Sequence, residues 1–147
     1  MRLLERFVYV DPSCKSWLAP AGAVVDGASI PQVAWSVIGG PFEGKYRDAS
    51  VIHDVACSEK KASWQEVHLV FYYAMLARNV EILRAKVMYA AVYHFGPRWG
   101  PPNAKGTEPR SLREQDFETL RNTIERRETA KEPQGPMSLE EIRSFRP

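Results

Sequence analysis

Two of the three histidines stand within or beside the stripes of apolar residues that predict the buried faces of helices. In "SVIHDVACSE", His53 shares a helix face with Ala49 and Ile52, and Asp54 directly follows it. His68 lies beside the apolar stripe of the next predicted helix. Imidazole and carboxylate groups are ligands of zinc, manganese and iron, so this pattern indicates one divalent metal ion.

A loop aspartate completes the predicted site. Asp26 ends a predicted strand, and a helical hairpin would bring His53 and His68 to one level near it. The predicted metal ligands are therefore Asp26, His53, Asp54 and His68, and the predicted catalytic residues are Asp26, His53 and Asp54. A metal ion with an open coordination position lowers the pKa of bound water, so the expected reaction is hydrolysis of a phosphoester or of a cell-wall bond.

Other interpretations of the same residues stay open. The His-Asp pair can close a buried hydrogen-bond network without a metal. Cys57 stands one helical turn after His53, which permits a cysteine nucleophile with a histidine base, although a small buried cysteine is the commoner case. Ser29 is explained by capping the helix that follows it.

The elements that must position these residues follow from composition and period. "RFVYV" and "GAVVDGAS" predict strands, and "WLAP" adds a short one. A short helix is expected from Pro31, ending at Gly39 and Gly40. Three long helices follow in "KYRDASVIHDVACSE", in "WQEVHLVFYYAMLARN" with Ser63 as its cap and Glu66 at the capping-box position, and in "EILRAKVMYAAVYHF" before Gly96.

The C-terminal segment has a different composition. "SLREQDFETLRNTIERRETAKE" predicts a charged helix, and "MSLEEIRSF" predicts a short last helix capped by Ser138. The charged helix has a thin apolar stripe at Leu112, Phe117, Leu120 and Ile124. We therefore expect an α+β fold, with a small N-terminal antiparallel sheet packed on a three-helix core in residues 1–103 and a charged helical appendage in 104–147.

Composition narrows the functional classes. The 147 residues are 44% hydrophobic and 26% charged, with a net charge of +2, as in an ordinary globular protein. No basic stripe tracks phosphates, so nucleic acid is not favoured, although a local patch could form from Arg47, Arg78, Arg84, Lys86 and Arg98. No run approaches the roughly 20 apolar residues of a membrane span. We expect the protein in the bacterial cytoplasm or in a virion.

The segment "DGASIPQVAWSVIGGPFEGKYRDASVIHDVAC" resembles a small family of unknown function that is widespread in bacteriophage and prophage genomes. Its members carry a pattern like T-D-x-A-S-I-P, a Gly-Pro segment, a basic residue and an A-x-x-H-D helix. The resemblance runs from Asp26 to about Phe71, and it implies that Asp26, Ser29, His53 and Asp54 are the signature polar residues. Where members have an aspartate, this chain has His68, three residues before Phe71.

Two functions then compete. The first is a small metal-dependent hydrolase of a phage or prophage. The second is a non-enzymatic phage accessory or virion protein in which the Asp/His cluster is structural. That protein would bind a protein partner through the C-terminal helices and the aromatic residues of "GPRWGPPN".

Overall fold

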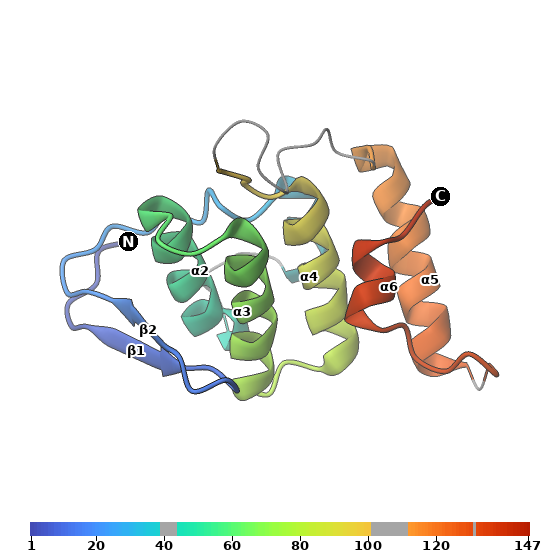
Figure 1. Ribbon diagram of the computed structural model, residues 1–147, viewed down its shortest axis with the longest axis horizontal. Helices are drawn as coiled ribbons and strands as arrows, with labels where there is room; N and C mark the ends of the chain where they lie inside the picture. Colours follow the sequence, from blue (N-terminus) through green and yellow to red (C-terminus); the bar gives the residue numbers. More distant parts are fainter. Residues whose placement is uncertain (39–43, 101–111, 131) are drawn as a thin grey trace.

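The computed structural model describes residues 1–38, 44–100, 112–130 and 132–147 (Figure 1). Within them, the sheet is one antiparallel hairpin of β1 (Phe7–Val10) and β2 (Ser16–Ala19). Trp17 and Ala19 on β2 are buried, whereas Leu18 between them is 49% exposed, so one face of the hairpin packs inward. This hairpin and the helices confirm the predicted α+β class.

One carboxylate organises the turn of the hairpin. Asp11 Oδ1 accepts hydrogen bonds from the backbone N–H groups of Ser13 and Lys15, at 2.8 and 3.0 Å. Its Oδ2 accepts from Trp17 Nε1 at 2.8 Å. These bonds and the burial of Asp11 explain why "WLAP" forms a strand that directs its indole inward.

The strand predicted in "GAVVDGAS" is wrong. This segment forms one isolated antiparallel bridge, between Val24 and Arg2, beside a hydrogen bond from Leu3 N to Ala23 O of 2.9 Å. Gly22 and Gly27 have φ angles of +84° and +78°, which end the extended backbone on both sides. β-branched composition predicted extension here, but the structure pairs this segment at a single bridge.

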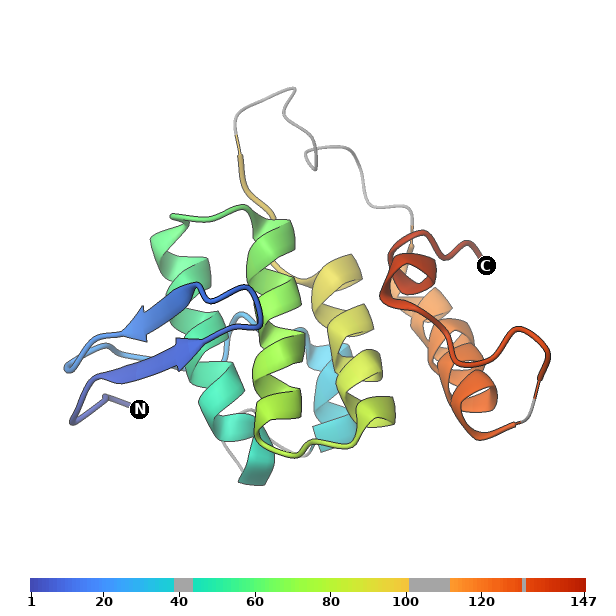
Figure 2. The same ribbon diagram turned by 60° about the horizontal axis from the view of Figure 1, so that its bottom comes forward.

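The three core helices form one row. α2, α3 and α4 lie side by side, with the hairpin on α2 and with α5 and α6 on α4 (Figures 1 and 2). Their bounds, together with two short 3-10 turns, are α1 Gln32–Ile38, η1 Gly44–Tyr46, α2 Arg47–Glu59, α3 Trp64–Ala77, α4 Ile82–Phe95, η2 Glu114–Asp116, α5 Phe117–Thr129 and α6 Leu139–Arg143. None of these described helices has the length and apolar character needed to cross a membrane.

Most predicted helix ends are confirmed. Ser63 Oγ accepts from Glu66 N at the start of α3, and Gly96 follows the last residue of α4. Ser138 and Glu141 form a reciprocal capping box at α6. The Glu66 carboxylate instead pairs with Lys15 Nζ at 2.8 Å. The predicted end of the first helix at Gly39 and Gly40 lies outside the described residues.

The C-terminal helices pack against the core. Their predicted apolar stripe is buried in the hydrophobic cluster that contains α3 and α4, and its members are Leu112, Phe117, Leu120 and Ile124. Lys86 on α4 forms an ion pair with Glu128 on α5, and both side chains are at least nine-tenths buried. The thin apolar stripe of the charged helix therefore packs against the core of the same chain.

Candidate metal centre

Two buried histidines meet between α2 and α3. His53 Nε2 lies 2.8 Å from His68 Nδ1, and the two residues are 1% and 0% exposed. The two helices lie side by side and are joined by a short connection (Figure 1). Each histidine is on the helix side that faces the other helix, so the two rings meet.

Cys57 supplies a third donor atom. It follows His53 by one helical turn, and its Sγ lies 3.7 Å from His53 Nε2. One donor atom each from His53, Cys57 and His68 lie within 4.8 Å of one another, and all three residues are buried. Across the described parts of the chain, this is the group of histidine, cysteine and acidic residues with the spacing of a metal site.

The outward ring nitrogens also have partners. His53 Nδ1 lies 3.1 Å from Ser29 Oγ, and His68 Nε2 lies 2.9 Å from the carbonyl oxygen of Pro97. Histidines that bind metals usually donate their other N–H to an acceptor, which fixes the ring's orientation and tautomer. Both rings can use this arrangement, with Nε2 of His53 and Nδ1 of His68 left to face an ion.

Without an ion, the same contacts form a directed chain of hydrogen bonds. The Pro97 carbonyl only accepts, so His68 must carry its proton on Nε2. A neutral His68 then accepts at Nδ1 from His53 Nε2–H, and His53 Nδ1 accepts from the Ser29 hydroxyl. Ser29 was predicted as a helix cap. It is only 6% exposed, and its hydroxyl contacts His53.

Burial determines the protonation of the centre. Desolvation, assisted by the nearby His68, holds the pKa of His53 well below its ordinary value of 6.5. Desolvation, together with the negative charge of Asp54, raises the pKa of the Cys57 thiol to about 12. At neutral pH His53 is therefore uncharged and Cys57 is a thiol, so a metal must displace the thiol proton in order to bind.

The two predicted carboxylates accept hydrogen bonds from the backbone outside the three-residue group. Asp54 Oδ2 accepts from the backbone N–H of Asp26 at 3.1 Å, and Asp26 Oδ1 accepts from Ala28 N at 2.9 Å. Asp54 is 6% exposed, whereas Asp26 is exposed and its side chain closes its own loop. Of the four predicted ligands, the structure brings His53 and His68 together, while Asp26 and Asp54 are not in the three-residue group.

Cys57 is the donor that sequence reasoning did not assign to a metal. Its spacing of four residues from His53 was visible, but it suggested a nucleophile. A thiol with a pKa raised to about 12 is a poor nucleophile at neutral pH, because the thiolate is the reactive form. The signal for a ligand was the combination of this spacing with a histidine on the following helix.

Aromatic side chains enclose the centre. The ring centroids of His53 and Phe71 are 4.7 Å apart, and those of His68 and Trp64 are 5.6 Å apart. Trp99 lies edge-on to His68 at 6.4 Å and donates from Nε1 to the carbonyl oxygen of Ala62 at 2.9 Å. Trp99 therefore ties the segment after α4 to the connection between α2 and α3.

The family model for "Protein of unknown function (DUF1353)" matches residues 1–92. The chain belongs to this family. The matched range contains His53, Cys57 and His68, but it ends before Pro97 and before the C-terminal helices. Membership of DUF1353 thus covers the three donor residues without assigning an activity to them.

Two similar proteins come from Sinorhizobium fredii. The uncharacterized protein y4jT is 52% identical over 97 residues, which cover 66% of this chain and 29% of that protein. The uncharacterized protein y4iH is 45% identical over 94 residues, or 64% of this chain and 39% of that protein. The alignments thus span well under half of each relative. No solved structure matches this DUF1353 chain.

Proposed function

We propose that this DUF1353 chain binds one zinc ion through His53 Nε2, Cys57 Sγ and His68 Nδ1. The observation that carries the proposal is the close group of three donors whose two imidazoles both have partners on their outer nitrogens. Imidazole and thiolate are preferred zinc ligands, and the thiolate disfavours manganese.

Two of the three donor distances are close to those of tetrahedral zinc, whereas the donor atoms of Cys57 and His68, which lie within 4.8 Å of each other, need to approach by up to about 1.2 Å. With Zn–N near 2.05 Å and Zn–S near 2.3 Å, tetrahedral geometry places two nitrogens about 3.3 Å apart and nitrogen and sulfur about 3.6 Å apart. The Cys57 Sγ to His53 Nε2 distance is 3.7 Å. The two imidazole nitrogens, at 2.8 Å, need to separate by about half an ångström.

The chemistry we propose for this centre is hydrolysis. Three protein ligands leave a fourth position, and zinc with an open position lowers the pKa of bound water to about 7. Asp54, whose negative charge acts on Cys57, is the carboxylate we propose as the general base. The donors are buried and none of them lines the pocket at β2, so hydrolysis requires the enclosing side chains to move and admit the substrate, which favours a small phosphoester over a cell-wall polymer. A phage or prophage setting remains part of this proposal and rests on the sequence resemblance.

Zinc binding is the first experiment. Protein purified without a histidine tag is treated with chelator, and zinc is titrated in competition with a chromophoric chelator. We expect one ion per chain, and Cys57→Ala and His68→Ala to lose more affinity than the 10–100-fold typical of removing an outer hydrogen-bond partner. Cys14→Ala and His94→Gln are the matched controls, because Cys14 is exposed and His94 binds the Ile142 carbonyl outside the centre.

Cobalt gives a direct test of the thiolate ligand. Cobalt bound by sulfur has a charge-transfer absorption in the near ultraviolet, which Cys57→Ala must abolish while Cys14→Ala keeps it. Equal zinc affinity in the wild type and in Cys57→Ala, with no cobalt–sulfur band, would refute the centre. Turnover of a chromogenic phosphodiester that follows zinc occupancy and is lost in Asp54→Asn would support the hydrolytic role.

A structural role is the second candidate, favoured by the complete chain from Ser29 through His53 and His68 to Pro97. Here the protein is a non-enzymatic accessory protein that binds a partner, with α5 and α6 as the partner surface. Leaving one buried group of this hydrogen-bond series without a partner lowers the unfolding free energy by about 1–3 kcal/mol. Such a protein would bind no stoichiometric zinc, and His68→Gln would lower its unfolding free energy equally with and without chelator.

A further inference from the structure

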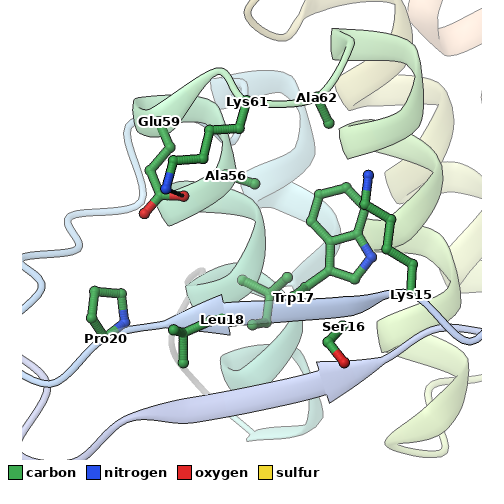
Figure 3. A pocket seen from close by; sticks show the side chains of 10 residues that line it. Lys15, Ser16, Trp17, Leu18, Pro20, Ala56, Glu59, Lys61 and Ala62 are labelled. Atoms are coloured by element: carbon green, nitrogen blue, oxygen red, sulfur yellow. Dashed lines mark ion pairs between the residues drawn. The ribbon is translucent and has the colours of Figure 1, made fainter.

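A pocket of about 460 Å³ opens between β2 and the end of α2 (Figure 3). Its volume falls within the usual range of small-molecule sites, about 300–1,000 Å³. Its apolar lining comes from both sides of the gap and consists of Trp17, Leu18, Pro20, Ile52, Ala56 and Ala62. None of the three donor residues lines it.

Two ammonium groups reach this pocket from opposite sides. Lys15 belongs to the turn before β2, and its Nζ lies 4.6 Å from the centre of the Trp17 ring. Lys61 belongs to the connection after α2 (Figure 3). Glu59 is the one acidic residue among the lining residues, so the charge of the lining is positive by one unit.

Both lysines have weak ion pairs that a ligand can replace. Lys15 Nζ lies 2.8 Å from Glu66, with side chains 47% and 40% exposed. Lys61 Nζ lies 3.6 Å from Glu59, with side chains 80% and 35% exposed. Exposed pairs of this kind contribute little to stability, because water screens them and two long side chains lose freedom. Moving the two ammonium groups from these carboxylates to a bound anion therefore costs little free energy.

We propose that this pocket binds a small organic anion with a flat apolar body. The body contacts Ile52, Ala56 and the indole of Trp17, and the anionic group lies between the ammonium groups of Lys15 and Lys61. This combination of apolar walls with a few charged groups is the usual composition of a small-molecule site. The proposal requires no metal, because every group that it uses lies outside the three donors.

The test uses the full chain in the presence of chelator, so that its result is independent of zinc binding. The probes are 2-naphthoate, 2-naphthyl phosphate and the neutral 2-naphthalenemethanol, titrated calorimetrically. We expect saturable binding of one anion per chain, and the two anions compare carboxylate with phosphate. The neutral alcohol, which lacks the charge interaction, should bind about tenfold more weakly.

Variants locate the binding within the pocket. Lys61→Gln removes one ammonium group, and Lys60→Gln is its matched control, because the neighbouring lysine does not line the pocket. Ala56→Leu fills the apolar floor, with circular dichroism used to verify folding. We expect weaker anion binding in Lys61→Gln and Ala56→Leu and unchanged binding in Lys60→Gln. Failure of both anions to saturate, equal binding of the alcohol, or equal loss in Lys60→Gln would overturn the proposal.

Discussion

His53 Nε2 and His68 Nδ1 lie 2.8 Å apart and form one hydrogen bond, and both side chains are buried. Only one proton fits on the line between these two nitrogens. Addition of a second proton charges a desolvated ring, whereas replacement of the proton by a cation leaves both rings neutral. This contact therefore disfavours protonation of either ring but is compatible with a bound metal ion.

Acid should destabilise the metal-free protein. The folded-state pKa of His53 is well below 6.5, so the unfolded chain binds more protons as the pH falls through 6.5. The free energy of unfolding therefore rises with pH across this window and decreases on acidification. Thermal unfolding at several pH values between 7.5 and 5 measures this change. For one group we expect a slope of at most roughly 1.4 kcal/mol per pH unit.

His53→Gln provides the comparison, since it removes this titration. Its melting temperature should depend less on pH than that of the wild type over the same window. His94, whose pKa burial lowers to about 4, still titrates in this variant and contributes the same sign. Identical pH profiles for the wild type and His53→Gln would show that His53 carries no such linkage.

The two cysteines should differ in reactivity. Cys14 is exposed, whereas burial raises the pKa of Cys57 to about 12, so little thiolate forms there. At pH 8 we expect an aromatic disulfide reagent to modify one thiol rapidly and the other only as the protein unfolds. Cys14→Ser should lose the rapid phase, and a rapid phase that persists in this variant would contradict the burial of Cys57.

Trp99→Phe tests the segment that covers His68. The change removes the hydrogen bond from Trp99 Nε1 to Ala62 O, and we expect a loss of about 1 kcal/mol in unfolding free energy. Urea denaturation measures it. Trp35→Phe is the control, because Trp35 makes a longer indole bond of 3.3 Å to Ile30 O and is 41% exposed. The prediction fails if the control is the more destabilised variant.

Glu128→Gln tests the docking of α5 on α4. It leaves the buried Lys86 without its carboxylate, which should reduce the unfolding free energy by about 3–5 kcal/mol. Glu118→Gln breaks the exposed pair with Arg121 and should change stability by less than about 1 kcal/mol. Similar effects of the two changes would mean that the Lys86 pair contributes no more than a surface contact.

Periodicity and capping chemistry predicted the parts of the fold that depend on local sequence. His53 was placed within or at the border of an apolar stripe, and His68 beside one, because apolar spacing indicates which side of a helix faces inward. Ser138 was identified from its capping pattern, which needs only four residues. Residues 1–103 as a separate compact unit stay a prediction, although the stripe at Leu120 and Ile124 does pack on α4.

The rest depends on which segments meet, and the spacing of residues does not contain that information. The pairing of Ser29 with His53 follows from the path of the loop after Asp26. The grouping of Cys57 with both histidines follows from the packing of α2 against α3, which brings the donor atoms of the three residues within 4.8 Å of one another. The false strand at Val24 arose because composition indicates extension but not how a neighbouring segment pairs with it.

The contacts of the candidate centre all lie between Ser29 and Pro97, and its central pair spans 15 residues of sequence. Contacts between residues close in sequence form quickly, and a growing chain folds from its N-terminal side. The ribosome therefore releases every residue of the centre before α5 and α6. On this order of synthesis, the nascent chain acquires the three residues of the candidate centre while the partner of Lys86 has yet to be made.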